Sequence, residues 1–174
     1  MVVKPARDTE RQRVYDAEDA AFLETSYSER IGERGCRWLL ERLVATSWWD
    51  VAVGPAPVLR AARADSARST TVVRGCLSEV RIGPGMDQAH VLSHELAHIA
   101  ASPAAGHGPR FRAAHLDVAR VLLGRHGAGR LAQAYERAGL LVDRRQWPPP
   151  TEHGIGGLLA VWESREALDG LLRR

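Results

Sequence analysis

The sequence predicts an α+β fold in which two helices come first, a small sheet follows, and further helices complete the chain. Apolar residues recur at helical spacing over residues 8–24 and 26–46. Residues 69–74 are rich in β-branched side chains, and residues 77–82 alternate between apolar and polar, which is typical of strands. Helical spacing returns beyond residue 87. A chain of 174 residues, 45% of them apolar, is long enough for one domain with its own hydrophobic core.

The first two predicted helices each open with the spacing of a capping box, in which two residues three apart satisfy free backbone N–H groups. These pairs are Thr9 with Gln12 and Ser26 with Glu29. Trp48-Trp49-Asp50 breaks the second helical pattern, and we expect the two tryptophans to pack in the core or at a sheet edge. Both helices are expected to pack on the core through their apolar faces.

Three strands are expected in the middle of the chain, at residues 58–62, 69–74 and 77–82, in a small and mostly antiparallel sheet. Pro84-Gly85 ends the last strand, and Asp87 is expected to cap the helix that follows.

The last of these strands is a candidate edge strand, because its alternation indicates that one of its faces is exposed. An edge strand with free N–H and C=O groups can bind an extended peptide by strand addition. We therefore interpret Val80 to Gly83 as a segment that holds substrate backbone. The alternative is that this strand is paired on both sides.

The stretch Val91–Ala101 contains the pattern HExxH. On a helix, His94 and His98 lie four residues apart and project from one face, where two imidazoles can bind one zinc ion. Glu95 follows the first histidine and can act as general base towards a metal-activated water. His90 also lies four residues before His94, but the glutamate directly after His94 favours His94 and His98 as the pair.

A third histidine follows in a turn after the motif helix. That helix is expected to end near Ser102-Pro103, because the residue before proline avoids the helical region. The sequence Gly106-His107-Gly108-Pro109 then turns on glycine, presents His107 and starts a new helix with proline at its first position. Three protein ligands with water in the fourth position are typical of catalytic zinc, so His107 is predicted as the third ligand. The alternative is an ordinary amphipathic helix with surface histidines.

Two helices are predicted after this turn, at residues 110–123 and 130–138, with a loop at residues 124–129 between them. His115 falls on or near the buried face of the first helix and is interpreted as a core histidine, or as a reserve metal ligand. Tyr135 in the second helix is expected to pack inward, and it could donate a hydrogen bond to an oxyanion if it faced the metal.

The C-terminal region differs in composition from the rest of the chain. Residues 1–143 are predicted to form the domain with the metal site, residues 144–153 a charged and then proline-rich linker, and residues 154–174 a tail with a short amphipathic helix. A tail of this size is too small to fold alone, so we expect it to dock on the domain or to bind a partner.

Composition narrows the cellular context. The net charge is +3, and only Lys4 among the 24 basic residues is a lysine. The sequence has no basic stripe interleaved with aromatic residues, so nucleic-acid contact is not favoured. We expect a cytoplasmic protein with no membrane association, because the N-terminus lacks an apolar signal segment and no run is long enough to span a bilayer. Cys36 and Cys76 are far apart and are expected to be free thiols.

Three stretches of the chain resemble a small family of actinobacterial HExxH metallohydrolases. They are Arg7–Glu18, Val91–His98 followed by His107–Phe111, and Ala134-Tyr135 with Gly139-Leu140. This resemblance implies a zincin-like fold, hydrolase activity, a Zn²⁺ ion bound by His94, His98 and His107, and Glu95 as the base. More distantly, the HExxH helix and the later His-Gly with a following aromatic residue are similar to SprT-type zinc metalloproteases, although the sequence has no zinc ribbon and no DNA-binding appendage.

The leading hypothesis is a zinc-dependent metallopeptidase that acts on a peptide or protein substrate. Glu95 would take the proton of the attacking water and pass it to the leaving amine. Two alternatives remain. The chain could be a catalytically silent metal-binding or interaction module that uses its C-terminal tail for contacts, or a DNA-associated SprT-like protease. The intact HExxH pattern argues against the silent module.

Overall fold

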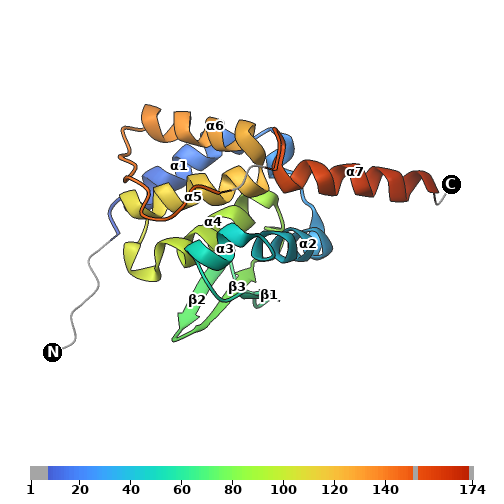
Figure 1. The fold of residues 1–174 in the computed structure, drawn as a ribbon, viewed down its shortest axis with the longest axis horizontal. Coiled ribbons are helices and arrows are strands. Elements are labelled where there is room, and N and C mark those ends of the chain that lie inside the picture. The colour runs from blue at the N-terminus through green and yellow to red at the C-terminus, as the bar shows by residue number, and fades with distance from the viewer. Residues whose placement is uncertain (1–7, 151–152, 173–174) are drawn as a thin grey trace.

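The computed structural model describes residues 8–150 and 153–172, and these form the α+β fold expected from the sequence (Figure 1). Helices precede and follow a three-stranded sheet. In chain order, the elements are α1 (Arg11–Phe22), η1 (Ser26–Ser28), α2 (Gly32–Val44), α3 (Ser47–Ala52), β1 (Val58–Ala61), β2 (Thr70–Arg74), β3 (Leu77–Ile82), α4 (Ala89–Ala101), η2 (Pro103–Ala105), α5 (Pro109–Leu122), α6 (Gly124–Arg137) and α7 (Gly157–Leu172). The two η elements are short 3-10 turns.

Helix α4, which contains the HExxH pattern, lies between the sheet and the helices α5, α1 and α6 (Figure 1). It packs against β2 and β3 on one side and against α5 on the other. Helix α6 in turn packs on α5 and on α1. Leu92 and Leu96 of α4 are completely buried as a result. Close-packed interiors leave side chains little freedom, so a helix enclosed in this way holds its own side chains in fixed positions.

The sheet has the strand order β1-β3-β2 and is mixed rather than mostly antiparallel. β1 runs parallel to β3, and β2 runs antiparallel to it. Val80 is therefore paired on both sides, with Leu59 and with Thr71. The prediction of an edge strand at Val80 to Gly83 is wrong, because β3 is the central strand of the sheet. Along β3, Val80 is buried and Leu77, which points to the opposite face, is exposed, so the alternation reflects a difference between faces and not a free edge.

The two N-terminal helices begin later than predicted, and neither predicted capping box forms. α1 begins after Glu10, whose side chain makes no capping hydrogen bond. The segment predicted as one helix over residues 26–46 is divided into η1 and α2. Arg30, which lies between these elements, forms a β-bridge with Gln88 just before α4. This non-local pairing keeps the chain extended there, and it overrides the local helical preference.

Two further helices start at different residues from those predicted. Asp87 does not cap α4, because its carboxylate accepts two hydrogen bonds from Arg30 at 2.5 and 3.0 Å, and Gln88 occupies the N-cap position. α6 begins at Gly124, inside the segment predicted as a loop. Gly124 has a φ of 75° and lies so close to the backbone of Gly157 that a Cβ would not fit. Glycine is therefore required where α6 meets the start of α7.

The C-terminal region first packs on the rest of the molecule and then leaves it. Residues 141–150 have no regular secondary structure, and Trp147 among them donates a hydrogen bond to the buried carboxylate of Asp117. Trp48-Trp49 is buried as predicted, and Trp48 donates from its indole N–H to the carbonyl of Pro148 at 3.0 Å. Helix α7 packs against α2, α5 and α6 through its first turns, where Leu158, Leu159 and Trp162 are buried, and its C-terminal end projects from the molecule (Figure 1). No helix within the described ranges combines the length and the apolar character needed to cross a membrane.

Candidate metal centre

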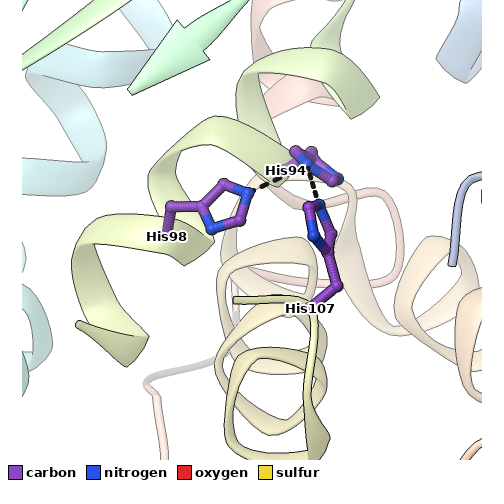
Figure 2. A group of neighbouring side chains, drawn as sticks. All are labelled: His94, His98 and His107. Carbon is purple, nitrogen blue, oxygen red and sulfur yellow. Dashed lines mark hydrogen bonds between the residues drawn. The ribbon is translucent and has the colours of Figure 1, made fainter. Parts of the chain in front are cut away.

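The turn after α4 brings a third histidine back to the two on the helix. Ser102, directly after α4, has a φ of 77°, which turns the chain away from the helix axis. Gly106 adopts a φ of 52°, and Gly108 is the N-cap residue of α5, with Pro109 at the first helical position. His107 lies between these two glycines and points towards His94 and His98 (Figure 2). This local path agrees with the turn predicted from the Gly-His-Gly-Pro sequence.

The three histidines present their Nε2 atoms to one another at distances that suit a metal ion. Nε2 of His94 lies 3.2 Å from Nε2 of His98 and 3.3 Å from Nε2 of His107 (Figure 2). All three ligand atoms lie within 4.8 Å of one another. Nitrogen ligands around tetrahedral zinc lie about 3.3–3.4 Å apart, since each Zn–N bond is about 2.0–2.1 Å long. The two separations that involve His94 therefore match the edges of a zinc tetrahedron.

The other ring nitrogen of two of these histidines is bound to a carboxylate. Nδ1 of His94 lies 2.7 Å from Oε1 of Glu18, and Nδ1 of His107 lies 2.5 Å from Oδ2 of Asp8. In the neutral imidazole, an N–H at Nδ1 leaves Nε2 as a lone pair. Lone pairs that converge in this way repel one another unless a proton or a metal ion lies between them. The carboxylate–imidazole arrangement is also the usual support of histidines that bind metal.

The N-terminal segment fastens the turn that carries His107. The backbone N–H of His107 donates to Asp8 at 3.2 Å, and the carbonyl of His107 accepts a hydrogen bond of 2.7 Å from Nη1 of Arg112. Nη1 of Arg112, whose side chain is buried, also donates to Oε2 of Glu10 at 3.0 Å. The orientation of His107 thus depends on contacts between the start of α1 and α5. These contacts join parts of the chain that are about a hundred residues apart in sequence.

The ionisation of the histidines follows from burial and from these carboxylates. Burial opposes the charged forms of both Glu18 and His94, but their mutual attraction outweighs it, so the pKa of Glu18 is lowered and the pKa of His94 is raised. Burial, aided by the charges of the neighbouring imidazoles, lowers the pKa of His98 to about 2. Burial also lowers the pKa of His107, although Asp8 acts in the opposite sense. His98 and His107 are therefore neutral near pH 7, the form that binds metal.

Glu95 is a buried carboxyl group that is held by the sheet. Oγ1 of Thr71, on β2, lies 2.8 Å from Oε2 of Glu95 and 2.7 Å from the carbonyl oxygen of the same residue. A hydroxyl has one proton, so Thr71 donates to one of these oxygens at a time. Burial raises the pKa of Glu95, and the charge of His94 and the Thr71 hydroxyl act against this shift only in part. A carboxyl pKa that moves towards neutrality suits a general base.

An open cleft of 690 Å³ leads to these groups. His94 and Glu95 line it together with Tyr15, whose ring centroid is 5.3 Å from the ring centroids of both His94 and His107. A volume of this size is within the range of about 300–1,000 Å³ that is usual for ligand sites. The cleft therefore reaches the candidate metal centre at His94 and Glu95, whereas His98 and His107 do not line it.

Comparisons of the chain with known protein families, with curated proteins and with solved structures found no match. The side chains themselves must therefore indicate the chemistry. Three imidazoles whose Nε2 atoms converge can hold a divalent metal ion, and a buried carboxyl group beside them can accept a proton. The cleft lets a ligand reach His94 and Glu95. Binding of a metal with water activation is the chemistry that this combination allows.

The two other histidines weighed as ligands contact neighbouring residues, and His115 also joins Glu18 and His94 in a second group whose ligand atoms lie within 4.8 Å of one another. His90 makes a contact of 2.9 Å between its Nδ1 and the carbonyl oxygen of Tyr27. His115 is completely buried on α5, and its Nδ1 lies 2.8 Å from the hydroxyl of Tyr135. Tyr135 is itself completely buried and bonds His115, so it packs inward and does not face the three Nε2 atoms. His115 also lies 3.5 Å from Glu18, behind His94. His115 thus contacts the same carboxylate that holds the ring of His94.

Several residues of the site were missed by reasoning from the sequence. They are Asp8, Tyr15, Glu18, Thr71 and Arg112. One of them left a local signal, because Glu18 is a carboxylate on the face of α1 that buries Val14, Ala17 and Ala21. A charged side chain on a buried stripe requires a partner. The other four residues are brought to the site by tertiary packing alone.

Proposed function

We propose that this chain is a zinc-dependent hydrolase of zincin-like fold that cleaves a peptide bond. The observation that carries the proposal is the convergence of three Nε2 atoms at spacings of 3.2 and 3.3 Å from His94. Two of the rings are held by carboxylates in the manner of metal ligands, which supports the assignment of His94, His98 and His107. The donor set of three imidazoles is one that catalytic zinc uses.

Zinc held there would polarise the scissile carbonyl and make water acidic enough to attack it near neutral pH. Glu95 would accept the proton of that water and transfer it to the leaving amine. The hydroxyl of Thr71 would keep the carboxylate of Glu95 turned towards the cleft. Glu18 and Asp8 would hold the rings of His94 and His107 in the tautomer whose Nε2 is free for metal.

An extended substrate could lie along the free edge of β2. Among the described residues, β2 pairs only with β3, and the two strands are joined by the two residues Gly75-Cys76. In such a hairpin, Arg74 and Leu77 next to the turn form a hydrogen-bonded pair, so the backbone groups of Thr71 and Val73 point away from β3. The Thr71 side chain contacts Glu95, so this edge runs beside the proposed base. Substrate binding by strand addition is thus assigned to β2 instead of β3.

The first test is the metal content, measured by mass spectrometry on untagged protein purified without chelator. About one zinc per chain is expected in the wild type and in the Glu95→Gln variant, because Glu95 is not a ligand. His98→Ala is expected to lose the metal. His90→Ala is the matched control, since this histidine also lies four residues from His94 but bonds Tyr27, and it should keep the zinc. Absence of metal from the wild type, or loss of metal in His90→Ala with retention in His98→Ala, would overturn the assignment.

The second test is cleavage of a mixture of peptides by the zinc-loaded protein, with the products identified by mass spectrometry. The wild type should cleave at defined bonds, and Glu95→Gln should retain zinc and lose turnover. Cleavage by Glu95→Gln at the rate of the wild type would contradict its role as base. A zinc-loaded wild type that leaves all peptides intact would contradict a peptide bond as the target.

A further inference from the structure

Two arginines converge on one tyrosine that lines the cleft. The guanidinium carbon of Arg11, on α1, lies 5.5 Å from the ring centroid of Tyr15, and that of Arg68, in the loop before β2, lies 6.0 Å from it. Nε of Arg11 also donates to the hydroxyl of Tyr15 at 3.2 Å. Stacking on an aromatic face holds a guanidinium group without neutralising it. Tyr15 therefore positions two positive charges that come from separate elements.

These charges lie at the metal end of the cleft. The ring of Tyr15 is 5.3 Å from the rings of both His94 and His107. Arg68 and Tyr15 line the same 690 Å³ cleft as Glu95. The guanidinium of Arg11 is close enough for its charge to act on Glu95, on His94 and on His98. An anionic group bound by these arginines would lie next to the bond that reaches the metal centre.

Neither arginine has a carboxylate partner among the described residues, whereas comparable arginines do. Arg30 pairs with Asp87, Arg112 with Glu10 and Arg145 with Asp117. The acidic groups at the metal centre are already bonded, Glu18 to His94, Asp8 to His107 and Glu95 to Thr71. Two guanidinium groups of like charge on one ring repel each other, and a bound anion between them would relieve that repulsion.

The backbone of Arg68 is held in place, although its side chain is exposed. Its carbonyl accepts a hydrogen bond of 2.8 Å from Oγ of Ser66. Next to it, Oγ of Ser69 accepts a hydrogen bond of 3.0 Å from the backbone N–H of Gly83. The backbone of Arg68 also packs so closely on Gly83 that a Cβ there would lie 2.9 Å from it. The loop is thus fixed to the end of β3, and Arg68 extends from a defined position towards Tyr15.

We propose that Arg11 and Arg68 form a carboxylate-binding site that holds a negatively charged group of the substrate beside the scissile bond. The proposal rests on the proposed hydrolase function and names a substrate class for it, peptides with a carboxylate close to the cleaved bond. Arginine suits this role because its N–H groups match the two oxygens of a carboxylate. The carboxylate can come from an acidic side chain or from the C-terminus of the peptide.

The test compares two hydroxamates, because a hydroxamate group chelates zinc whatever is attached to it. Succinic acid monohydroxamate carries a free carboxylate, and its monoamide has a carboxamide of the same shape. Binding of each to the zinc-loaded full chain is measured by calorimetry. The wild type should bind the carboxylate probe at least about tenfold more tightly than the amide, the size of one charge-assisted hydrogen bond in a partly exposed site. This preference should fall in Arg11→Gln and in Arg68→Gln and vanish in the double variant.

Arg63→Gln is the matched control, because Arg63 lies in the same loop, carries the same charge and pairs with Asp65 away from Tyr15. It should retain the preference for the carboxylate probe. Two longer hydroxamates then separate the two sources of the carboxylate. One ends in a free C-terminal carboxylate, and the other is amidated at its C-terminus and carries a glutamate side chain.

The outcomes distinguish this proposal from the proposed function. Equal binding of both short probes, or a preference that survives in the double variant, would overturn the arginine site and leave the zinc site intact. Binding of the carboxylate probe alone, lost in the double variant, would support the arginine site and contradict zinc chelation. Failure of both probes to bind would overturn both proposals.

Discussion

Two buried glutamates flank His94 and differ in what surrounds them. Glu18 reaches His94 from α1 and is 7% exposed, and Glu95 follows His94 in the chain, faces β2 and is 6% exposed. Burial opposes ionisation of both, yet the pKa of Glu18 is lowered and that of Glu95 is raised. Glu18 has a hydrogen bond of 2.7 Å from an imidazole, whereas the carboxylate of Glu95 has, among the residues that the structure describes, only the hydroxyl of Thr71 as a donor.

This difference shows that nearly equal burial can give one residue type two roles. A carboxylate with a cationic or metal-bound partner stays charged and holds that partner in position. A carboxyl group with one neutral hydrogen-bond donor retains an affinity for protons, which a general base requires. In the proposed hydrolase, the α1 side of the centre would therefore govern metal binding, and the β2 side would govern proton transfer. Variants on the two sides should therefore differ in whether zinc affinity or turnover is lost.

The largest effect is expected on the β2 side, in Glu95→Gln. Loss of the proton acceptor should lower kcat by about 10²–10⁴-fold, the usual contribution of a general base. Zinc affinity should stay near that of the wild type, because the three imidazoles are unchanged. Steady-state kinetics and a zinc titration on the same preparation measure both quantities. A variant that lost zinc in proportion to its activity would remove the distinction between the two glutamates.

On the α1 side, Glu18→Gln should produce the opposite pattern. Zinc affinity is expected to fall by about 10–100-fold, because the ring of His94 loses the charged group that orients it. At saturating zinc, kcat should recover much of the wild-type value. Competition with a chromogenic chelator measures the affinity. Asp19→Asn is the control, since Asp19 is the exposed neighbour of Glu18 and lines the cleft without bonding a histidine, and unchanged affinity in Glu18→Gln would refute the assignment.

The sequence predicted the parts of this centre that depend on local chain geometry. Helical spacing placed His94 and His98 on one face, and the glycines on each side of His107 made the turn predictable. Thr71 reaches the centre through packing of β2 against α4, which no local pattern encodes. The buried face of α1 indicates that Glu18 needs a partner, but only the tertiary structure shows that this partner is His94. The edge-strand prediction failed for a related reason, because alternation reports which faces are exposed and not which strands are neighbours.

A smaller loss of zinc affinity is expected in Asp8→Asn. Asp8 supports His107 as Glu18 supports His94, but its side chain is 31% exposed, so water can replace part of the lost interaction. The affinity should fall by about tenfold, at the lower end of the range for such supporting groups. Asp16→Asn removes the same charge from the exposed face of α1 and should have no effect. A loss in Asp8→Asn that exceeded that in Glu18→Gln would reverse the order of the two supports.

The smallest effect is expected in Thr71→Val, and it concerns pH. The Thr71 hydroxyl stabilises the ionised form of Glu95 against burial, so its removal should raise the pKa of Glu95 further above its ordinary value. The ionised form is the base, and activity falls as the pH drops through this pKa. The acid limb of the kcat/KM profile should therefore move to higher pH in Thr71→Val, with the rate at high pH little changed. Thr70→Val, at the neighbouring exposed position of β2, should leave the profile unchanged. An acid limb that stayed in place or moved to lower pH would show that the hydroxyl bonds the carbonyl of Glu95 and not its carboxylate.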